Sequence, residues 1–311
     1  MSELSQIVNI VLPVFLVIGL GYALKRRGFL DEAVNSVLSR LVFYLAAPAL
    51  LFRAAALTDL EEALELRSAG VVIAASVAAA LFTYLAAARS SPDRRGVLVQ
   101  GAYRGNLVFV GLPVLTNALG SGREVMGSAS VLIGIITPVY NFLAVVALTL
   151  PHRGEDGASV AWKRAGLDIL RNPLIWSCVL GLIFSALELP LPGVADKSLE
   201  LVGDIAMPLA LLVVGASLDF NRLRAELIPS LAVSAVKLLL YPGLAFVLLK
   251  LWGLSGLAIQ VPVLLIASPT AVVSHIMARE MKGDEQLAAA IVIGTTLVSL
   301  FTISLWIVVL I

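Results

Sequence analysis

Charged residues are scarce in this chain, and their scarcity excludes most kinds of soluble protein. Asp, Glu, Lys and Arg together make up 14% of the 311 residues, whereas hydrophobic residues make up 59%. Soluble proteins carry about 25% charged residues, because their surface must face water. Two soluble domains of this combined length would lack the polar surface that they need, so a soluble catalytic domain is excluded.

Cysteine and histidine are also rare, which removes most metal and redox chemistry. Cys178 is the only cysteine, and one thiol forms neither an internal disulfide nor a cysteine metal cluster. His152 and His275 are the only histidines, and the sequence contains no HExxH or GxSxG motif. The charges nearly cancel, at +1 overall, without a basic or acidic tail. We therefore expect no metal, no cofactor, no enzyme activity and no nucleic-acid partner.

Long apolar runs are what the chain has in abundance. A helix needs about 20 apolar residues to cross a lipid bilayer, and in lipid its backbone polar groups must be satisfied internally. The sequence therefore predicts an all-α membrane protein that is embedded in the lipid bilayer. Its ten transmembrane helices are expected over roughly 6–24, 34–57, 68–88, 96–119, 125–150, 173–189, 197–219, 225–250, 254–278 and 286–311.

The basic residues predict how these spans are oriented. Fourteen Lys and Arg residues lie in one set of connecting loops and five in the opposite set. Because cytoplasmic loops carry the excess of Lys and Arg, the richer side is expected in the cytoplasm. Both termini of this multi-pass protein then lie outside the inner (plasma) membrane. No Lys or Arg precedes the first apolar run, so we interpret it as a retained helix rather than a signal peptide.

A polar connection near the middle of the chain predicts two halves. We expect a first five-helix repeat over 1–150, a short cytoplasmic linker over 151–172, and a second five-helix repeat over 173–311. Since five is odd, the second half enters from the opposite side and the repeat is inverted. Pro48 and Pro208 stand 160 positions apart, and Pro113 and Pro269 stand 156 apart, each pair in corresponding spans. Inverted repeats with interrupted helices indicate a secondary transporter, with its substrate near the midplane.

The fourth and ninth spans are expected to be broken and to cross at the membrane centre. Gly105 and Gly111 tolerate unusual backbone angles and Pro113 lacks an N–H, which predicts an unwound stretch between them. Unwinding exposes a helix N-terminus that attracts anions, and the Asn106 amide can donate and accept hydrogen bonds. A kinked helix, with Asn106 bonded to neighbouring backbone, is the alternative.

Three ionisable residues within or near the spans are candidates for a functional role, because charge at membrane depth is costly. Lys237 lies near the middle of the eighth span and needs a carboxylate, a carbonyl or an anionic substrate as its partner. Arg104 either serves the site or extends to the cytoplasmic face. Asp204 precedes Pro208 by one helical turn. Three roles are open for it: a partner for Lys237, a proton carrier, or a solvated carboxylate without a function.

Two further polar residues complete the candidates. Asn141 is an amide within the fifth span that could line the same cavity, and His275 either titrates near neutral pH or makes a structural hydrogen bond at the interface. We assign Lys237, Asp204 and His275 to charge coupling. The predicted substrate-binding residues are Arg104, Gly105, Asn106, Pro113, Asn141, Pro269, Thr270 and Ser274.

Motifs in five or six of the spans resemble those of one known family. They are Arg104-Gly-Asn106, Phe109-x-Gly-Leu-Pro113, Thr137-Pro-Val-Tyr-Asn141, Met207-Pro-Leu-Ala-Leu-Leu-Val-Val-Gly-Ala-Ser-Leu218 and Ser268-Pro-Thr-Ala-Val272. The chain is similar over nearly its whole length to bacterial permeases of the auxin efflux carrier family.

This resemblance implies a fold like that of the bile acid:sodium symporters. Spans 1, 2, 6 and 7 would form a scaffold, through which two copies form a homodimer. Spans 3–5 and 8–10 would form a mobile transport domain that moves like an elevator. The substrate would be a small organic anion, auxin-like or a dicarboxylate. Val273 stands where the family often has an asparagine after the ninth-span proline, which leaves Asn106 as the crossover amide, with Thr270 and Ser274 as substitutes.

The function expected from these observations is secondary transport of a small organic anion, with H+ or Na+ as the candidate coupling ion. An ion or solute channel is one alternative, although a channel favours a continuous polar stripe that the sequence lacks. A non-transporting membrane receptor is the other, and the paired helix breaks argue against it.

Overall fold

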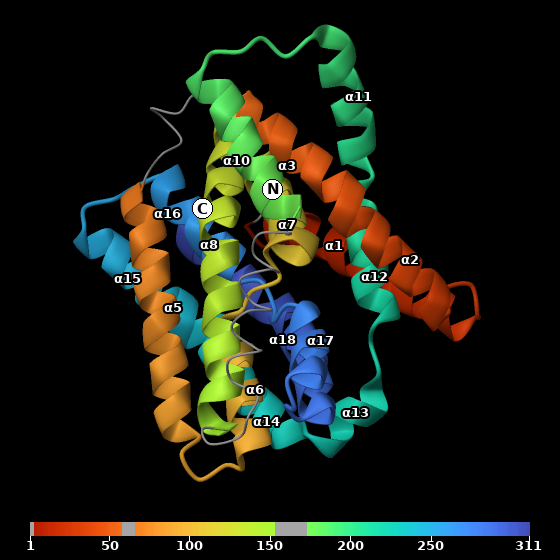
Figure 1. Ribbon diagram of the computed structural model, residues 1–311, viewed down its shortest axis with the longest axis vertical. Helices are drawn as coiled ribbons and strands as arrows, with labels where there is room; N and C mark the ends of the chain where they lie inside the picture. Colours follow the sequence, from red (N-terminus) through yellow and green to blue (C-terminus); the bar gives the residue numbers. More distant parts are fainter. Residues whose placement is uncertain (1–2, 58–65, 153–172) are drawn as a thin grey trace.

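The computed structural model describes residues 3–57, 66–152 and 173–311, and in these ranges the chain is helical (Figure 1). The predicted linker over 151–172 lies outside the described residues from position 153 onward. The α-helices of the first half are α1 Glu3–Arg26, α2 Glu32–Leu41, α3 Ala47–Ala56, α5 Leu66–Ala86, α6 Pro92–Tyr103, α7 Leu112–Leu119 and α8 Arg123–Thr149. Those of the second half are α10 Pro173–Ala186, α11 Gly193–Asp204, α12 Ala206–Ala216, α13 Phe220–Ala225, α14 Leu227–Ala235, α15 Tyr241–Leu251, α16 Leu257–Ile266, α17 Val273–Glu280 and α18 Glu285–Leu310.

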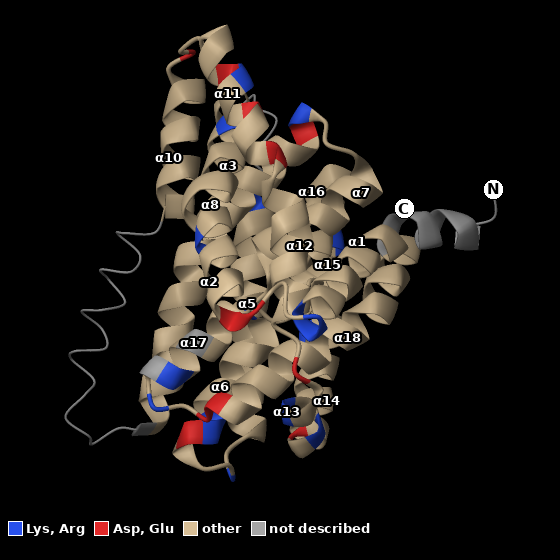
Figure 2. Cartoon of the chain, turned by 90° about the vertical axis from the view of Figure 1, so that its right-hand side faces the viewer, with Lys and Arg blue, Asp and Glu red and all other residues tan. Residues whose placement is uncertain are grey.

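Six helical segments are long and apolar enough to cross a membrane. They are Glu32–Ala56, Arg67–Ala86, Arg123–Thr149, Gly193–Ala216, Leu227–Leu251 and Glu285–Leu310. Figure 2 shows charged residues gathered near α11 at one end and near α6, α13 and α14 at the other, with a largely uncharged band between. The all-helical membrane class predicted from composition is confirmed.

Three α-helices, α3, α7 and α15, each directly follow a π-helical turn, and each has a proline as its second residue. The turns are η1 Val42–Ala46, η2 Leu107–Gly111 and η4 Val236–Leu240, followed by Pro48, Pro113 and Pro242. Proline has no N–H, and its ring collides with the carbonyl four residues earlier in a regular α-helix. The wider π turn accommodates the ring, so the helix continues past the proline.

Glycines bring two pairs of helices into close contact. A Cβ atom at Gly21 of α1 would overlap the carbonyl oxygen of Leu212, and one at Gly215 of α12 would overlap that of Ile18. Likewise, a Cβ at Gly181 of α10 would meet α3 at the Ala55 side chain and the Phe52 carbonyl oxygen. Between helices in lipid, packing rather than the hydrophobic effect drives association, so such close approach is the main source of stability.

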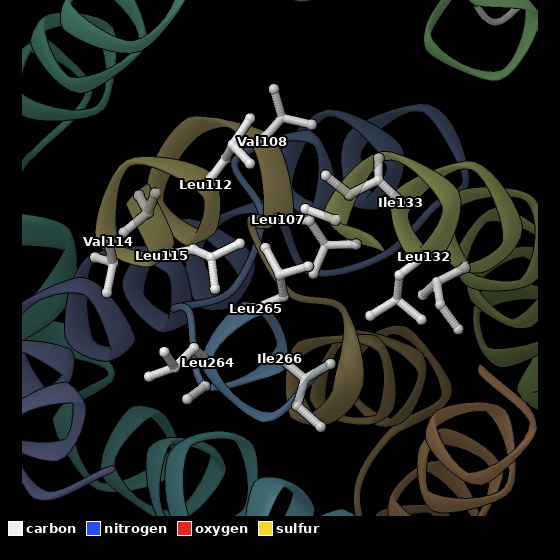
Figure 3. Packing of buried hydrophobic residues seen from close by; sticks show 14 of the residues in the cluster. Leu107, Val108, Leu112, Val114, Leu115, Leu132, Ile133, Leu264, Leu265 and Ile266 are labelled. Carbon is white, nitrogen blue, oxygen red and sulfur yellow. The ribbon is translucent and has the colours of Figure 1, made fainter. Parts of the chain in front are cut away.

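One part of the largest buried cluster lies between the broken helices and α8. Leu107, Leu112 and Leu115 from η2 and α7 face Leu265 from α16, and Ile133 from α8 lies beside them (Figure 3). Each of these side chains is less than 9% exposed. The cluster holds η2, α7 and α16 together, and it therefore supports the segment of chain where each helix is interrupted.

An ion-pair network joins three helices at one end of the molecule. Arg94 of α6 donates two hydrogen bonds to the Glu226 carboxylate, at 3.0 and 2.6 Å, and one to Asp284 at 3.0 Å. Glu226 directly precedes α14, and Asp284 caps α18 by accepting a hydrogen bond from the Leu287 N–H at 2.9 Å. The hydrogen bond from Arg94 holds the pKa of the Glu226 carboxyl below its ordinary value.

Replacing Glu226 with glutamine should reduce the loss of protein stability that occurs as the pH falls below neutral. A carboxyl whose folded pKa is lowered stabilises the fold above its unfolded pKa, and that contribution is lost as the pH falls through the folded pKa. We expect Glu226→Gln to lower the free energy of unfolding at neutral pH by about 1 kcal/mol or less, because partial exposure screens the pair. Melting temperatures between about pH 7 and pH 4 test this; an unchanged acid dependence would contradict it.

Candidate functional site

Two interrupted helices cross and complete each other's backbone hydrogen bonds. The first is broken between α6 and η2, and the second between α16 and α17. The Asn106 N–H donates to the Pro269 carbonyl at 2.7 Å, and the Ala271 N–H donates to the Arg104 carbonyl at 2.9 Å. Gly105 and Thr270 pair as an isolated antiparallel bridge between them. We call this region the crossover, and its residues are 104–106 and 267–272.

The first break is shorter than the sequence predicts. The unwound stretch was expected to extend from Gly105 to Gly111 and Pro113, and this part of the prediction is wrong. The helix resumes at Leu107 as a π turn, in which the N–H groups of Val110 and Gly111 both donate to the Asn106 carbonyl. Pro113 then occupies the second position of α7, and it therefore lies outside the crossover.

Gly105 has no space for a side chain. A Cβ at this position would lie 3.0 Å from Ser268 Oγ and 3.2 Å from a methyl carbon of Leu107. Contacts of this length are tighter than nine in ten real Cβ contacts, so the side chains of Ser268 and Leu107 would have to shift by a few tenths of an ångström to admit a larger residue. Glycine avoids this shift where the two chains approach each other.

Hydroxyl groups satisfy the polar groups that the second break leaves free. Thr270 Oγ1 donates to the Gly101 carbonyl at 2.8 Å, and Ser268 Oγ donates to the Leu265 carbonyl at 2.6 Å. The Thr270 N–H in turn donates to Thr295 Oγ1 of α18 at 3.0 Å. At a helix break within a membrane, side chains must satisfy the backbone N–H and carbonyl groups that the break leaves without partners. Sequence reasoning did not select Thr295, although two adjacent threonines within an apolar span were a signal for it.

Arg104 is the buried cation on the α17 side of the crossover. Its side chain is 6% exposed, so it does not extend to the membrane face. The guanidinium donates to Asn141 Oδ1 of α8 at 2.6 Å and also contacts the sulfur of Met277 in α17. Among the Asp and Glu side chains that the structure describes, none pairs with it. Arg104 and Asn141, predicted separately for the site, are therefore brought together.

Lys237 is the second buried cation, on the α16 side. Its side chain is 0% exposed, and its ammonium donates to the carbonyl oxygens of Ile266 and Ser268. Of the three partners that the sequence left open, the structure shows carbonyls. Of the three alternatives for Asp204, its position fits the solvated carboxylate and not the partner of Lys237, because Asp204 is exposed at the end of α11, where its charge acts on Arg53 and Lys197.

Comparison with known proteins identifies the family of the chain. The family model described as "Membrane transport protein" matches residues 6–307. The chain belongs to this family of membrane transporters. The resemblance to auxin efflux carriers seen in the motifs is thereby confirmed.

Three relatives illustrate the range of the family. A protein of Methanothermobacter thermautotrophicus named "Uncharacterized transporter" is 30% identical over 304 residues, which cover 96% of this chain and 97% of that protein. The "Putative malonate transporter" of Rhizobium meliloti is 27% identical, covering 97% and 95%. "Auxin efflux carrier component 6" of Arabidopsis thaliana is 28% identical over 144 residues, covering 43% of this chain and 25% of that protein. All three are named as transporters or carriers, not as enzymes.

Three buried polar atoms near the crossover of this transporter have no hydrogen-bond partner among the described residues. They are the Oε1 atom of Gln100, the hydroxyl of Tyr103 and the hydroxyl of Ser274. Gln100 uses its amide nitrogen to donate to the Ser274 carbonyl at 2.9 Å. Leaving a buried polar atom unpaired costs about 1–3 kcal/mol. Sequence reasoning selected Ser274 but neither Gln100 nor Tyr103, whose only signal was their position next to the Arg104-Gly-Asn106 motif.

Asn106 and His275 occupy different surroundings. The Asn106 side chain is 6% exposed and makes no side-chain hydrogen bond within the part of the transporter that the structure describes. His275 is only half-buried, and its Nε2 lies 3.4 Å from a carboxylate oxygen of Glu285 at the start of α18. Asn106 therefore lies at the crossover without a side-chain hydrogen bond to the described residues, whereas His275 lies about one helical turn beyond the second break.

A chain of hydroxyl groups connects three helices beside Lys237. Tyr140 and Tyr241 share a hydrogen bond of 2.7 Å, and Tyr241 shares another of 2.7 Å with Ser76 Oγ, which donates to the Val72 carbonyl. Tyr140 belongs to α8, Tyr241 to α15 and Ser76 to α5. These hydrogen bonds join the three helices, and sequence reasoning missed them because the partners lie 101 and 165 positions apart in the chain.

Proposed function

We propose that this transporter is a secondary carrier of a small organic anion, whose carboxylate binds beside Arg104 at the crossover. The observation that carries the proposal is a buried guanidinium without a carboxylate partner among the described residues. An uncompensated buried charge is strongly unfavourable. A guanidinium matches a carboxylate with two parallel hydrogen bonds, so an anionic substrate is the partner that Arg104 needs.

Other groups near Arg104 favour the same ligand. The Ser274 and His275 N–H groups at the start of α17 already donate to the carbonyls of Ala271 and Val272, at 2.9 and 3.1 Å, so what the start of this helix offers an anion is the partial positive charge of the helix dipole. Within the described residues, Ser274 in the first turn of α17 has an unpaired hydroxyl, and the Asn106 amide makes no side-chain hydrogen bond. Together these groups offer hydrogen-bond donors for one carboxylate and little that would bind a cation.

We further propose that the chain crosses the membrane ten times as two inverted five-helix repeats, 1–150 and 173–311. The contacts of the helices support this division. Gly21 contacts Leu212, and 160 positions later Gly181 contacts Phe52, the counterpart of Leu212 at the same offset. Gly215 corresponds in the same way to Ala55. A repeat inverted in the membrane produces such a reciprocal exchange of contacts.

The proposed movement is an elevator-like shift of one group of helices against the other. The scaffold comprises α1, α2, α3, α10, α11 and α12, of which α2, α3, α11 and α12 lie together at the upper right of Figure 1. The transport domain comprises the helices from α5 to α8 and from α14 to α18, and it contains the whole crossover. Movement of this domain would carry Arg104 and the bound anion across the membrane together.

The remaining parts of the proposal rest on charge and on the relatives. The distribution of Lys and Arg favours an inner (plasma) membrane protein with both termini outside. The names of the relatives favour a malonate-like dicarboxylate or an auxin-like acid as substrate. The proposed assembly is a homodimer formed through the scaffold, and H+ or Na+ is the candidate coupling ion.

Ligand binding and flux together test this function. Purified protein should be stabilised against heat by at least one of malonate, malate and indole acetate, and liposomes containing it should show saturable uptake with counterflow. Unitary current steps would instead identify a channel, as a continuous polar pathway requires. Binding without any flux would identify a receptor. Either result would exclude the carrier.

Replacing Asn106 with alanine should abolish transport while leaving the protein folded. The Asn106 backbone holds the crossover together through its N–H and carbonyl, and alanine keeps both groups. The side chain has no hydrogen bond to lose within the described residues, so we expect the free energy of unfolding to change by less than about 1 kcal/mol. Counterflow of the stabilising acid measures the effect. Undiminished flux would remove Asn106 from the site.

A further inference from the structure

The Lys237 ammonium is held by backbone oxygen atoms at the end of a broken helix. It donates to the carbonyl of Ile266, the last residue of α16, and to that of Ser268 at 2.7 Å. The Tyr241 ring lies 5.4 Å away, within range of a cation–π interaction. A Cβ atom at Gly105 would come within 3.5 Å of the ammonium, so Lys237 reaches the point where the two breaks cross.

Such a set of carbonyl oxygens is a site for a cation. The last carbonyls of a helix have no partner within that helix, and the dipole places partial negative charge on them. In membrane carriers, unwound backbone and the C-terminal ends of half-helices coordinate the coupling cation. Here the same kind of oxygen atoms coordinate a lysine that is part of the chain.

The charge of Lys237 is not neutralised by an acidic side chain. No Asp or Glu of the described residues pairs with it, and the carbonyl oxygens compensate the ammonium through their dipoles alone. A second cation in contact with the same carbonyls would meet strong repulsion from the ammonium in this buried setting. The carbonyls of Ile266 and Ser268 therefore compensate the charge of one cation, and Lys237 supplies it.

We propose that Lys237 is a tethered cation that fills the cation site of the crossover, so that the protein binds its anion without a metal ion at this position. The inference rests on the proposed function only where it concerns the anion. The tethered cation itself is a property of the protein without substrate, and it is tested in that state.

Truncating Lys237 should create a requirement for a cation in solution. Lys237→Ala removes the ammonium and leaves the two carbonyls exposed to a small cavity. In choline chloride, whose cation is too large for the cavity, we expect a melting temperature roughly 5–10 °C below that of the wild type. Sodium, ammonium or methylammonium chloride at equal ionic strength should restore at least half of this loss. The wild type should melt at the same temperature in all four salts.

Two variants control for other effects of the salts and of the truncation. Lys250→Ala removes an exposed lysine from the end of α15, the helix that continues from the π turn of Lys237, and its melting temperature should not depend on the cation. Lys237→Met fills the cavity without a charge, so it should be destabilised but not restored by any of the cations. Equal restoration of Lys237→Ala by choline, or no restoration by any cation, would overturn the tethered cation.

Wild-type protein provides a test that does not depend on the variants. Of the two candidate coupling ions, the tethered cation selects H+ over Na+, so the affinity of the stabilising acid, measured by thermal shift, should be equal in sodium and in choline chloride. An affinity at least 3-fold higher in sodium would overturn the inference. If no acid binds, the proposed function is contradicted. The melting temperature of Lys237→Ala in the different salts, measured without substrate, still tests the tethered cation. The two failures are therefore distinguishable.

Discussion

Replacing Arg104 with glutamine is expected to weaken binding of the transported anion roughly 10- to 150-fold, because charged hydrogen bonds contribute about 1.5–3 kcal/mol and each 1.4 kcal/mol is tenfold in affinity. Glutamine keeps an N–H donor for Asn141 Oδ1 but cannot hold a carboxylate with two charged hydrogen bonds. The empty protein should be as stable as the wild type or more stable, since the variant no longer buries an unpaired charge.

This opposite effect on binding and on stability separates a ligand-binding arginine from a structural one. Isothermal titration with the stabilising acid gives the affinity, and thermal melting without ligand gives the stability. Arg104→Lys should recover part of the affinity, because it restores the charge without the planar fork. Arg89→Gln removes an exposed arginine before α6 and should leave both quantities unchanged. A destabilised Arg104→Gln protein with undiminished affinity would show that Arg104 only supports the fold.

Replacing Gly215 with alanine is expected to separate α1 from α12 and to destabilise the protein by about 1–3 kcal/mol or more, the usual effect of overpacking. The added Cβ would overlap the carbonyl oxygen of Ile18, which belongs to the backbone of a helix and cannot rotate away. Gly21 makes a similar close contact from the opposite helix, so neither helix can move without losing that contact as well. Thermal melting in detergent and the yield of monodisperse protein measure the effect.

A glycine on the partner helix provides the matched control. A Cβ at Gly19 of α1 would meet no atom within 4 Å, although Gly19 lies only two positions from Gly21. Gly19→Ala should leave stability unchanged or raise it by up to about 1 kcal/mol, because alanine favours the helix more than glycine does. Equal melting temperatures of the Gly215→Ala and Gly19→Ala proteins would contradict the close packing of α1 against α12.

The helical membrane fold could be predicted from sequence because apolar runs and charged loops are local properties of the chain. The helix from Arg123 to Thr149 lies within two residues of its predicted span at each end. The positions of the two helix breaks could be predicted from Gly105 and Pro269, whose backbone chemistry disfavours a regular helix. The length of the first break could not, because a π turn allows the helix to continue past Pro113.

Composition and spacing by themselves determined the class of protein, the location of the breaks and the identity of the buried cations. The partners of those cations were decided by tertiary structure. Lys237 lies 29 positions before Ile266, and Arg104 lies 37 positions before Asn141. Hydrogen bonds form between groups that packing brings within about 3 Å, and no local pattern encodes which distant groups these are. For the same reason sequence left open whether Asp204 pairs with Lys237, whereas the structure places it exposed at the end of α11, where its charge acts on Arg53.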